Sequence, residues 1–167
     1  MTELLLARHG ETQWNRERRW QGHADPPLND AGRAQAHELA TGLAGERLEA
    51  IYSSDLRRAY ETAEIAGARL GVPVTSDPDL REIDVGSWSG LTREQLEGRV
   101  WDGETTDAHA ERVLRAVRRI VELHPVGRVL IVTHGGSLRR LFERIGETER
   151  PAPANCELYR LAAHLLD

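Results

Sequence analysis

The sequence predicts an α/β fold in which helices cover both faces of a mostly parallel central sheet, a three-layer α/β/α sandwich. Apolar runs of strand length alternate with segments whose apolar residues recur at helical spacing, which indicates this fold class. Two of the runs, residues 4–7 and 129–133, are apolar or β-branched almost throughout, as buried parallel strands are. The chain of 167 residues has no Pro/Gly/Ser-rich linker, so we expect a single domain over residues 1–167.

The first half of the chain alternates between strands and helices. We expect a strand over residues 3–7, a long loop, and then a helix over residues 31–43 that Asn29 or Asp30 caps. A short strand over residues 50–52 follows.

The next helix is expected over residues 56–70. Residues 53–55 offer a cap at its start, and Gly71, with Pro73 just beyond, is a typical stop signal. The remaining expected elements are a strand over 72–75, an irregular stretch over 80–90, a brief helix over 92–97, a helix over 107–123, the strand over 129–133, a helix over 137–145 and a strand over 156–161.

Composition argues against several functional classes. The net charge of −5 and the lack of a continuous basic block argue against a nucleic-acid partner. No apolar run approaches the roughly 20 residues of a membrane span, and no secretory leader precedes the first run, so we expect no membrane association. The single cysteine, Cys156, can form no intramolecular disulfide, which favours the cytoplasm. We expect it to be a small buried residue on the last strand. The oligomeric state, a homodimer included, stays open.

Three predicted strand-to-helix junctions carry groups that suit one kind of chemistry. Arg8 and His9 follow the first strand, Arg58 lies in the first turn of the helix after the second, and His134 follows the strand over 129–133. Ligands of open α/β sheets bind at the carboxyl ends of the strands, so we expect these side chains to meet over one crevice. A helix start also favours anions, which adds to the case for Arg58.

An imidazole beside guanidinium groups suits phosphoryl transfer. The imidazole can form a covalent intermediate that divides one displacement into two easier steps, and arginine forks match phosphate oxygens. We expect the neighbouring positive charge to lower the pKa of His9 and keep its ring neutral. The leaving alkoxide needs an acid, and the residues alone leave Glu82 and Asp84 as alternatives.

Four spaced motifs resemble the signature of the histidine phosphatase superfamily, in its phosphoglycerate mutase-like branch. They are residues 8–12 with Trp14 and Asn15, residues 54–59, residues 80–86 and residues 133–136, and they cover nearly the whole chain in the expected order. The resemblance implies that His9 becomes phosphohistidine, that Arg8, Arg58 and His134 hold the phosphoryl group, and that Glu82 is the proton donor. It further implies substrate contacts from Asn15, Gln21, Gly22 and Gly135.

The resemblance implies a phosphoglycerate mutase-like fold and a phosphomonoester hydrolase that needs neither a metal nor another cofactor. Its substrate would be a small phosphorylated metabolite, and the family's classes are sugar phosphates, phosphoglycerates and α-ribazole phosphate. A cofactor-dependent phosphoglycerate mutase is the alternative. Residues 91–101 form a short segment, and Asp102-Gly103-Glu104-Thr105 stands where the family often has Pro-Gly-Gly-Glu-Ser, so we expect a reduced cap and an open, hydrolytic site.

Two other interpretations receive less support. A non-catalytic phosphate- or partner-binding module on the same fold would not need the full set of nucleophile, clamps and acid. A zinc site built from His9 and His134 lacks the usual ligand spacing.

The other histidines and the tryptophans have no motif support. We expect solvent exposure for the five histidines, which are His23, His37, His109, His124 and His164. For the four tryptophans, core and pocket rim are equally open assignments; they are Trp14, Trp20, Trp88 and Trp101.

Overall fold

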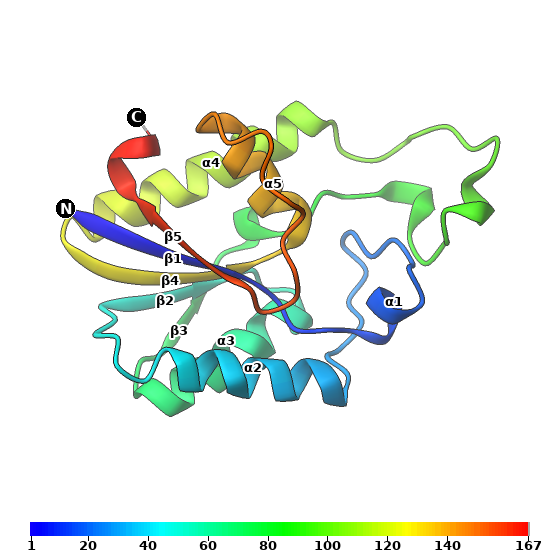
Figure 1. The fold of residues 1–167 in the computed structure, drawn as a ribbon. Helices are drawn as coiled ribbons and strands as arrows, with labels where there is room; N and C mark the ends of the chain where they lie inside the picture. Colours follow the sequence, from blue (N-terminus) through cyan, green and yellow to red (C-terminus); the bar gives the residue numbers. More distant parts are fainter. Residues whose placement is uncertain (167) are drawn as a thin grey trace.

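The computed structural model describes residues 1–166 and places a five-stranded sheet between two layers of helices (Figure 1). The strand order is β3-β2-β4-β1-β5, and only β5 runs antiparallel to its neighbour. The strands are β1 (Thr2–Arg8), β2 (Ala50–Ser53), β3 (Val74–Ser76), β4 (Gly127–Thr133) and β5 (Leu158–Ala162). The predicted mostly parallel sheet is therefore confirmed.

The helices cover both faces of this sheet, as predicted. Helices α2 and α3 lie on one face, and α4 and α5 lie on the other (Figure 1). The α-helices are α1 (Gln13–Arg16), α2 (Asp30–Gly42), α3 (Arg57–Leu70), α4 (Thr106–Leu123) and α5 (Gly135–Arg144). Single 3₁₀ turns are η1 (Pro78–Leu80), η2 (Gly86–Trp88), η3 (Glu94–Leu96) and η4 (Ala163–Leu166).

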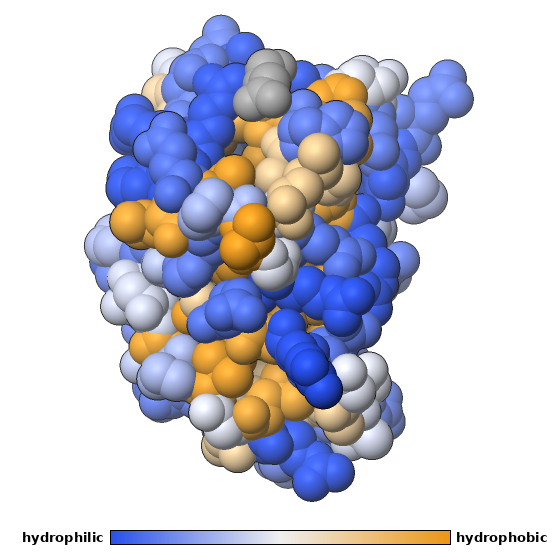
Figure 2. All heavy atoms as spheres, turned by 90° about the vertical axis from the view of Figure 1, so that its left-hand side faces the viewer, coloured by the Kyte–Doolittle hydropathy of each residue, from blue (hydrophilic) through white to orange (hydrophobic). Residues whose placement is uncertain are grey.

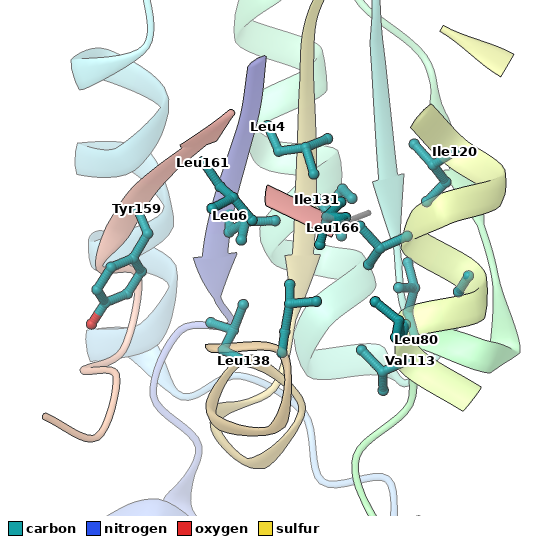
Figure 3. Packing of buried hydrophobic residues seen from close by; sticks show 14 of the residues in the cluster. Leu4, Leu6, Leu80, Val113, Ile120, Ile131, Leu138, Tyr159, Leu161 and Leu166 are labelled. Carbon is teal, nitrogen blue, oxygen red and sulfur yellow. The ribbon is translucent and has the colours of Figure 1, made fainter. Parts of the chain in front are cut away.

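The two core clusters explain why the central residues of β1 and β4, 4–7 and 129–132, are all apolar. Leu4 and Leu6 of β1 face α4 and α5, where they pack in the same cluster as Ile131 and Leu138 (Figure 3). The alternate residue Leu5 packs in the opposite cluster, toward α2 and α3. Because side chains alternate between the faces of a strand, a strand covered on both sides must be apolar at every position.

Leu130→Ala is expected to lower the free energy of unfolding by about 2–5 kcal/mol, because it leaves a cavity in a packed core. Leu130 lies in the central strand β4, is fully buried and belongs to the cluster under α2 and α3. Urea unfolding at neutral pH measures the change. A loss below about 1 kcal/mol would show that this cluster closes around the missing atoms.

Several local predictions needed correction. The predicted cap of α3 within residues 53–55 is wrong, because the N-cap is Leu56 and makes no side-chain cap bond. Cys156 precedes β5 instead of lying on it, and it is half-buried with a left-handed φ of 56°. Helix α1 was expected to be loop; a capping box between Thr12 and Asn15 holds it.

The amino-terminal end of the sheet lies opposite the carboxyl ends of the parallel strands. The start of β1 and the turn η4 lie there (Figure 1), and this face shows apolar patches among charged groups (Figure 2). Among residues 1–166, no helix combines the length and apolar character needed to cross a bilayer.

Candidate active site

The pairing of β1 with β4 places two histidines side by side. Arg8 is in register with Thr133, and the next residue, His9, donates its backbone N–H to the Thr133 carbonyl at 2.9 Å. His134 follows Thr133, so the two imidazoles meet with ring centroids 5.2 Å apart. Both side chains are buried. The expected meeting of two distant histidines over one crevice is thus present in the structure.

The hydrogen bonds of His9 fix which ring nitrogen can attack. Nδ1 lies 2.6 Å from the carbonyl oxygen of Gly10, which can only accept, so Nδ1 carries the hydrogen and Nε2 keeps its lone pair. Burial holds the pKa of His9 well below its ordinary value, and the charges of Arg58 and Arg8 lower that pKa further. The predicted direction is therefore correct, but burial is a larger cause than charge.

Two arginines flank the histidine pair. The guanidinium of Arg58 is buried, and its two Nη atoms donate to the carbonyls of Ala24 and Gly22 at 2.8 Å each. Burial lowers the pKa of Arg58 to about 10, which leaves it charged at neutral pH. Arg8 donates from Nη1 to the Pro153 carbonyl at 2.8 Å.

Three buried nitrogens of this cluster have no hydrogen-bond partner within residues 1–166. They are Nε of Arg8, Nε of Arg58 and Nδ1 of His134. The other nitrogen of His134, Nε2, lies 2.8 Å from the Ser54 hydroxyl, and when that hydroxyl donates to it, Nδ1 is a free donor. A buried donor without a partner costs about 1–3 kcal/mol, so three of them in one cluster indicate a site for an anion.

The structure distinguishes the two candidate acids. The carboxyl of Glu82 accepts from the backbone N–H groups of Gly136 and Ile83, each at 2.9 Å, and it lines the same cavity as His9. Asp84 is exposed and accepts from the N–H of Gly86, outside that cavity. The neighbouring Arg81 forms an ion pair with Asp55 instead of with Glu82.

The cavity has a volume of about 350 Å³, within the range of small-molecule sites. Asn15, Gln21 and Gly22, assigned to the substrate by resemblance, line it together with His9, Arg8, Arg58 and Glu82. Gly135 does not line it; a side chain there would press against Arg8, and the neighbouring Gly136 lines the cavity instead.

Three tryptophans form one cluster at the cavity rim. Trp20 lines the cavity and is 40% exposed, and its ring packs edge-on against Trp88 and Trp101 at centroid distances of 5.4 and 6.5 Å. The segment 86–104 is tied to this rim, since Trp20 and Leu91 share a backbone hydrogen bond. Within that segment the structure shows the 3₁₀ turns η2 and η3 and no α-helix.

Sequence reasoning missed two side chains near the cluster. Asn155, in the loop before β5, donates to the backbone carbonyl of His9 at 2.9 Å and to Asn15 at 3.4 Å. His109 on α4 is fully buried, which overturns its expected exposure; His23 and His124 are half-buried, whereas His37 and His164 are exposed as expected. No local pattern marks Asn155, because its partners lie at the other end of the chain.

A buried neutral imidazole beside two guanidinium groups, with a carboxyl in the same cavity, is the arrangement that phosphoryl transfer through a histidine nucleophile requires. The family model of the histidine phosphatase superfamily (branch 1) matches residues 4–165. The chain belongs to this superfamily.

Similar proteins carry several activities in their names. The chain is 40% identical to phosphoglycerate mutase-like protein 4 of Arabidopsis thaliana, over 89% of this chain and 73% of that protein. It is 38% identical to a metal-independent phosphoserine phosphatase of the same plant, over 87% and 69% of the two chains. A mycobacterial glucosyl-3-phosphoglycerate phosphatase, solved in complex with VO₃, superposes with a TM-score of 0.88 at 31% identity, over 96% and 90% of the chains.

The buried histidines predict that folding stability falls in mild acid. Burial lowers the pKa values of His9, His134 and His109 in the folded chain, so below the ordinary value of 6.5 the unfolded chain binds more protons at these positions. Stability is then lost as the pH falls through that value. Urea unfolding at pH 7.5 and 5.5 should show a lower midpoint at the acidic pH; equal midpoints would contradict the assignment of neutral buried rings.

Proposed function

We propose that this chain is a metal-independent phosphomonoester hydrolase, a single domain that acts on a small phosphorylated metabolite through a phosphohistidine intermediate at His9. The observation that carries the proposal is the set of buried, unpartnered nitrogens of Arg8, Arg58 and His134 around the ring of His9. Arginine forks and neutral imidazole N–H groups suit the oxygens of a phosphoryl group. The activities named for the relatives add support.

The first step forms a bond from Nε2 of His9 to phosphorus and breaks the bond from phosphorus to the ester oxygen. Glu82 gives its proton to that oxygen, so that an alcohol leaves and a carboxylate remains. The Nδ1–H bond to Gly10 persists and supports the positive charge that the phosphorylated ring acquires. Arg8, Arg58 and His134 hold the phosphoryl oxygens in this step.

The second step returns the enzyme to its starting state. The Glu82 carboxylate takes a proton from water as the water oxygen attacks phosphorus, and the bond from phosphorus to Nε2 breaks. Inorganic phosphate leaves, and His9 is again neutral with its hydrogen on Nδ1. A mutase would instead keep the phosphoryl group on His9 until it is transferred to a hydroxyl group of an organic acceptor in place of water.

Glu82→Gln is expected to separate substrates by their leaving groups. The amide keeps the size of the side chain but has no acidic proton, so kcat/KM for an alkyl phosphate should fall by about 10²–10⁴. p-Nitrophenyl phosphate releases a phenolate that needs no proton, so its phosphorylation step should change little. Asp84→Asn, outside the cavity, is the matched control. Equal losses for both substrates would contradict the role of Glu82 as the acid.

Phosphate release after metal removal tests the proposal as a whole. The purified protein, treated with EDTA, is assayed with p-nitrophenyl phosphate, 3-phosphoglycerate, phosphoserine, sugar phosphates and α-ribazole phosphate. We expect turnover to survive EDTA and to rank these substrates. Isomerisation of phosphoglycerate without phosphate release would favour a mutase, and silence on every substrate would favour a non-catalytic phosphate-binding module.

A further inference from the structure

His109 occupies an unusual position on the inner face of α4. The buried residues of this helix form an apolar stripe toward the sheet, and His109 lies among them with 1% of its surface exposed. An imidazole there must find polar partners, since burying it without them is unfavourable. Its partners lie directly behind the candidate acid, Glu82.

The contacts of His109 fix its hydrogen. Nε2 lies 3.0 Å from the Ser137 hydroxyl oxygen, and that hydroxyl donates to the Arg81 carbonyl at 3.1 Å. Because the hydroxyl hydrogen is thereby used, Nε2 must be the donor in the contact with Ser137. The same Nε2 lies 3.8 Å from Oε1 of Glu82. An N–H group is therefore placed beside the carboxyl that the proposed mechanism alternately protonates and ionises.

We propose that His109 is a positioning residue for Glu82: its Nε2–H is donated to Ser137, and the positive end of this N–H, 3.8 Å from Oε1, stabilises the carboxylate formed when the leaving group takes the proton. This inference rests on the proposed function, because it assigns Glu82 the acid–base role. His109 lies behind Glu82 and does not line the cavity.

The backbone around Glu82 has other supports, which separates the role of His109 from scaffolding. Arg112, one turn further along α4, donates to the carbonyls of Asp79, Arg81 and Glu82. His23 lies 2.9 Å from the Glu82 carbonyl as well. Replacing His109 should therefore leave the chain path in place and affect the carboxyl group.

Other charges also act on this pair and have to be held constant in any test. Burial lowers the pKa of His109, which keeps the ring neutral. The charged or titratable groups that face His109 are Glu82, Arg112, Glu104, Arg140 and His134. Those that face Glu82 are Arg8, Arg58 and His109.

Two substitutions at position 109 test the proposal. His109→Phe keeps a ring but has no donor, and His109→Gln keeps an N–H donor but cannot titrate in this range. For His109→Phe we expect kcat/KM for the best alkyl phosphate to fall about tenfold, part of the full contribution of a general acid, while p-nitrophenyl phosphate changes less than about threefold. The fall of kcat/KM on the alkaline side should move to higher pH, because the carboxylate has lost the nearby N–H dipole that stabilises its charge. His109→Gln should restore both properties.

Equal losses on both substrates, or an unchanged alkaline fall in His109→Phe, would overturn the proposal. If His109→Phe does not fold, nitrogen NMR of the unsubstituted protein decides instead. We expect the Nε2–H form of His109, with a resonance that moves in Glu82→Gln; the Nδ1–H form or an unmoved resonance would overturn the contact. Lack of turnover in the unsubstituted protein would refute the proposed function. Turnover in that protein, with kcat/KM and its pH dependence unchanged in the His109 variants, would refute only this inference.

Discussion

Replacement of His9 by alanine is expected to abolish phosphate release. Loss of a covalent nucleophile typically costs about 10⁴–10⁶ in kcat, because the remaining groups bind the substrate but supply no attacking atom. Among the described residues that line the cavity, His9 is the only imidazole and none is a cysteine, serine or threonine; His134 does not line it, and its ring is fully buried. Steady-state release of inorganic phosphate measures the effect.

His37→Ala is the matched control for His9→Ala. His37 lies on the exposed side of α2 and outside the cavity, so this variant should retain the activity of the unsubstituted protein. Circular dichroism and the urea midpoint establish whether His9→Ala folds. Substantial turnover by a folded, metal-free His9→Ala protein would refute the nucleophile.

Arg58→Leu is expected to give the second largest loss, about 10²–10³ in kcat/KM, the range found when one donor to a developing anion is removed. Leucine can replace neither set of donors. The Nη atoms of Arg58 donate to the carbonyls of Ala24 and Gly22, and its buried Nε has no partner within residues 1–166. Arg58→Lys keeps the positive charge but lacks the planar guanidinium, so its activity should lie between that of Arg58→Leu and that of the unsubstituted protein.

The neighbouring Arg57 gives a sharp control for Arg58. Arg57 is exposed at the first position of α3 and does not line the cavity, whereas Arg58 is buried and lines it. Arg57→Leu should retain full activity and the same affinity for inorganic phosphate. Equal losses in both variants would show that the effect comes from general positive charge near α3 and not from a phosphate clamp.

Much of the fold followed from the sequence because its signals are local. The central runs of β1 and β4, residues 4–7 and 129–132, are apolar at every position, as is typical of strands covered on both faces. Parallel strands end at one edge of the sheet, so Arg8, His9 and His134 could be placed together before any contact was known. Helix caps were predicted less accurately. A polar N-cap was expected for α3, but the N-cap is Leu56.

The parts of the site that could not be predicted depend on contacts between distant segments. His109 was expected to be exposed because no motif includes it, yet it is held by Ser137 and approaches Glu82. Asn155 reaches His9 across almost the whole chain. The choice between Glu82 and Asp84 was open from the residues alone, since both lie in the same predicted irregular stretch. In the structure Glu82 lines the cavity and accepts from Gly136 at the start of α5, whereas Asp84 is exposed outside it.

The measurement that tests the account most directly is the identification of the phosphorylated residue. The protein is mixed with p-nitrophenyl phosphate, quenched in alkali during turnover, digested and analysed by mass spectrometry, beside His9→Ala. The account predicts an acid-labile, alkali-stable phosphoryl group on Nε2 of His9 and none in the variant. A phosphoryl group on another residue, or full turnover without any covalent phosphoenzyme in single-turnover experiments, would contradict it.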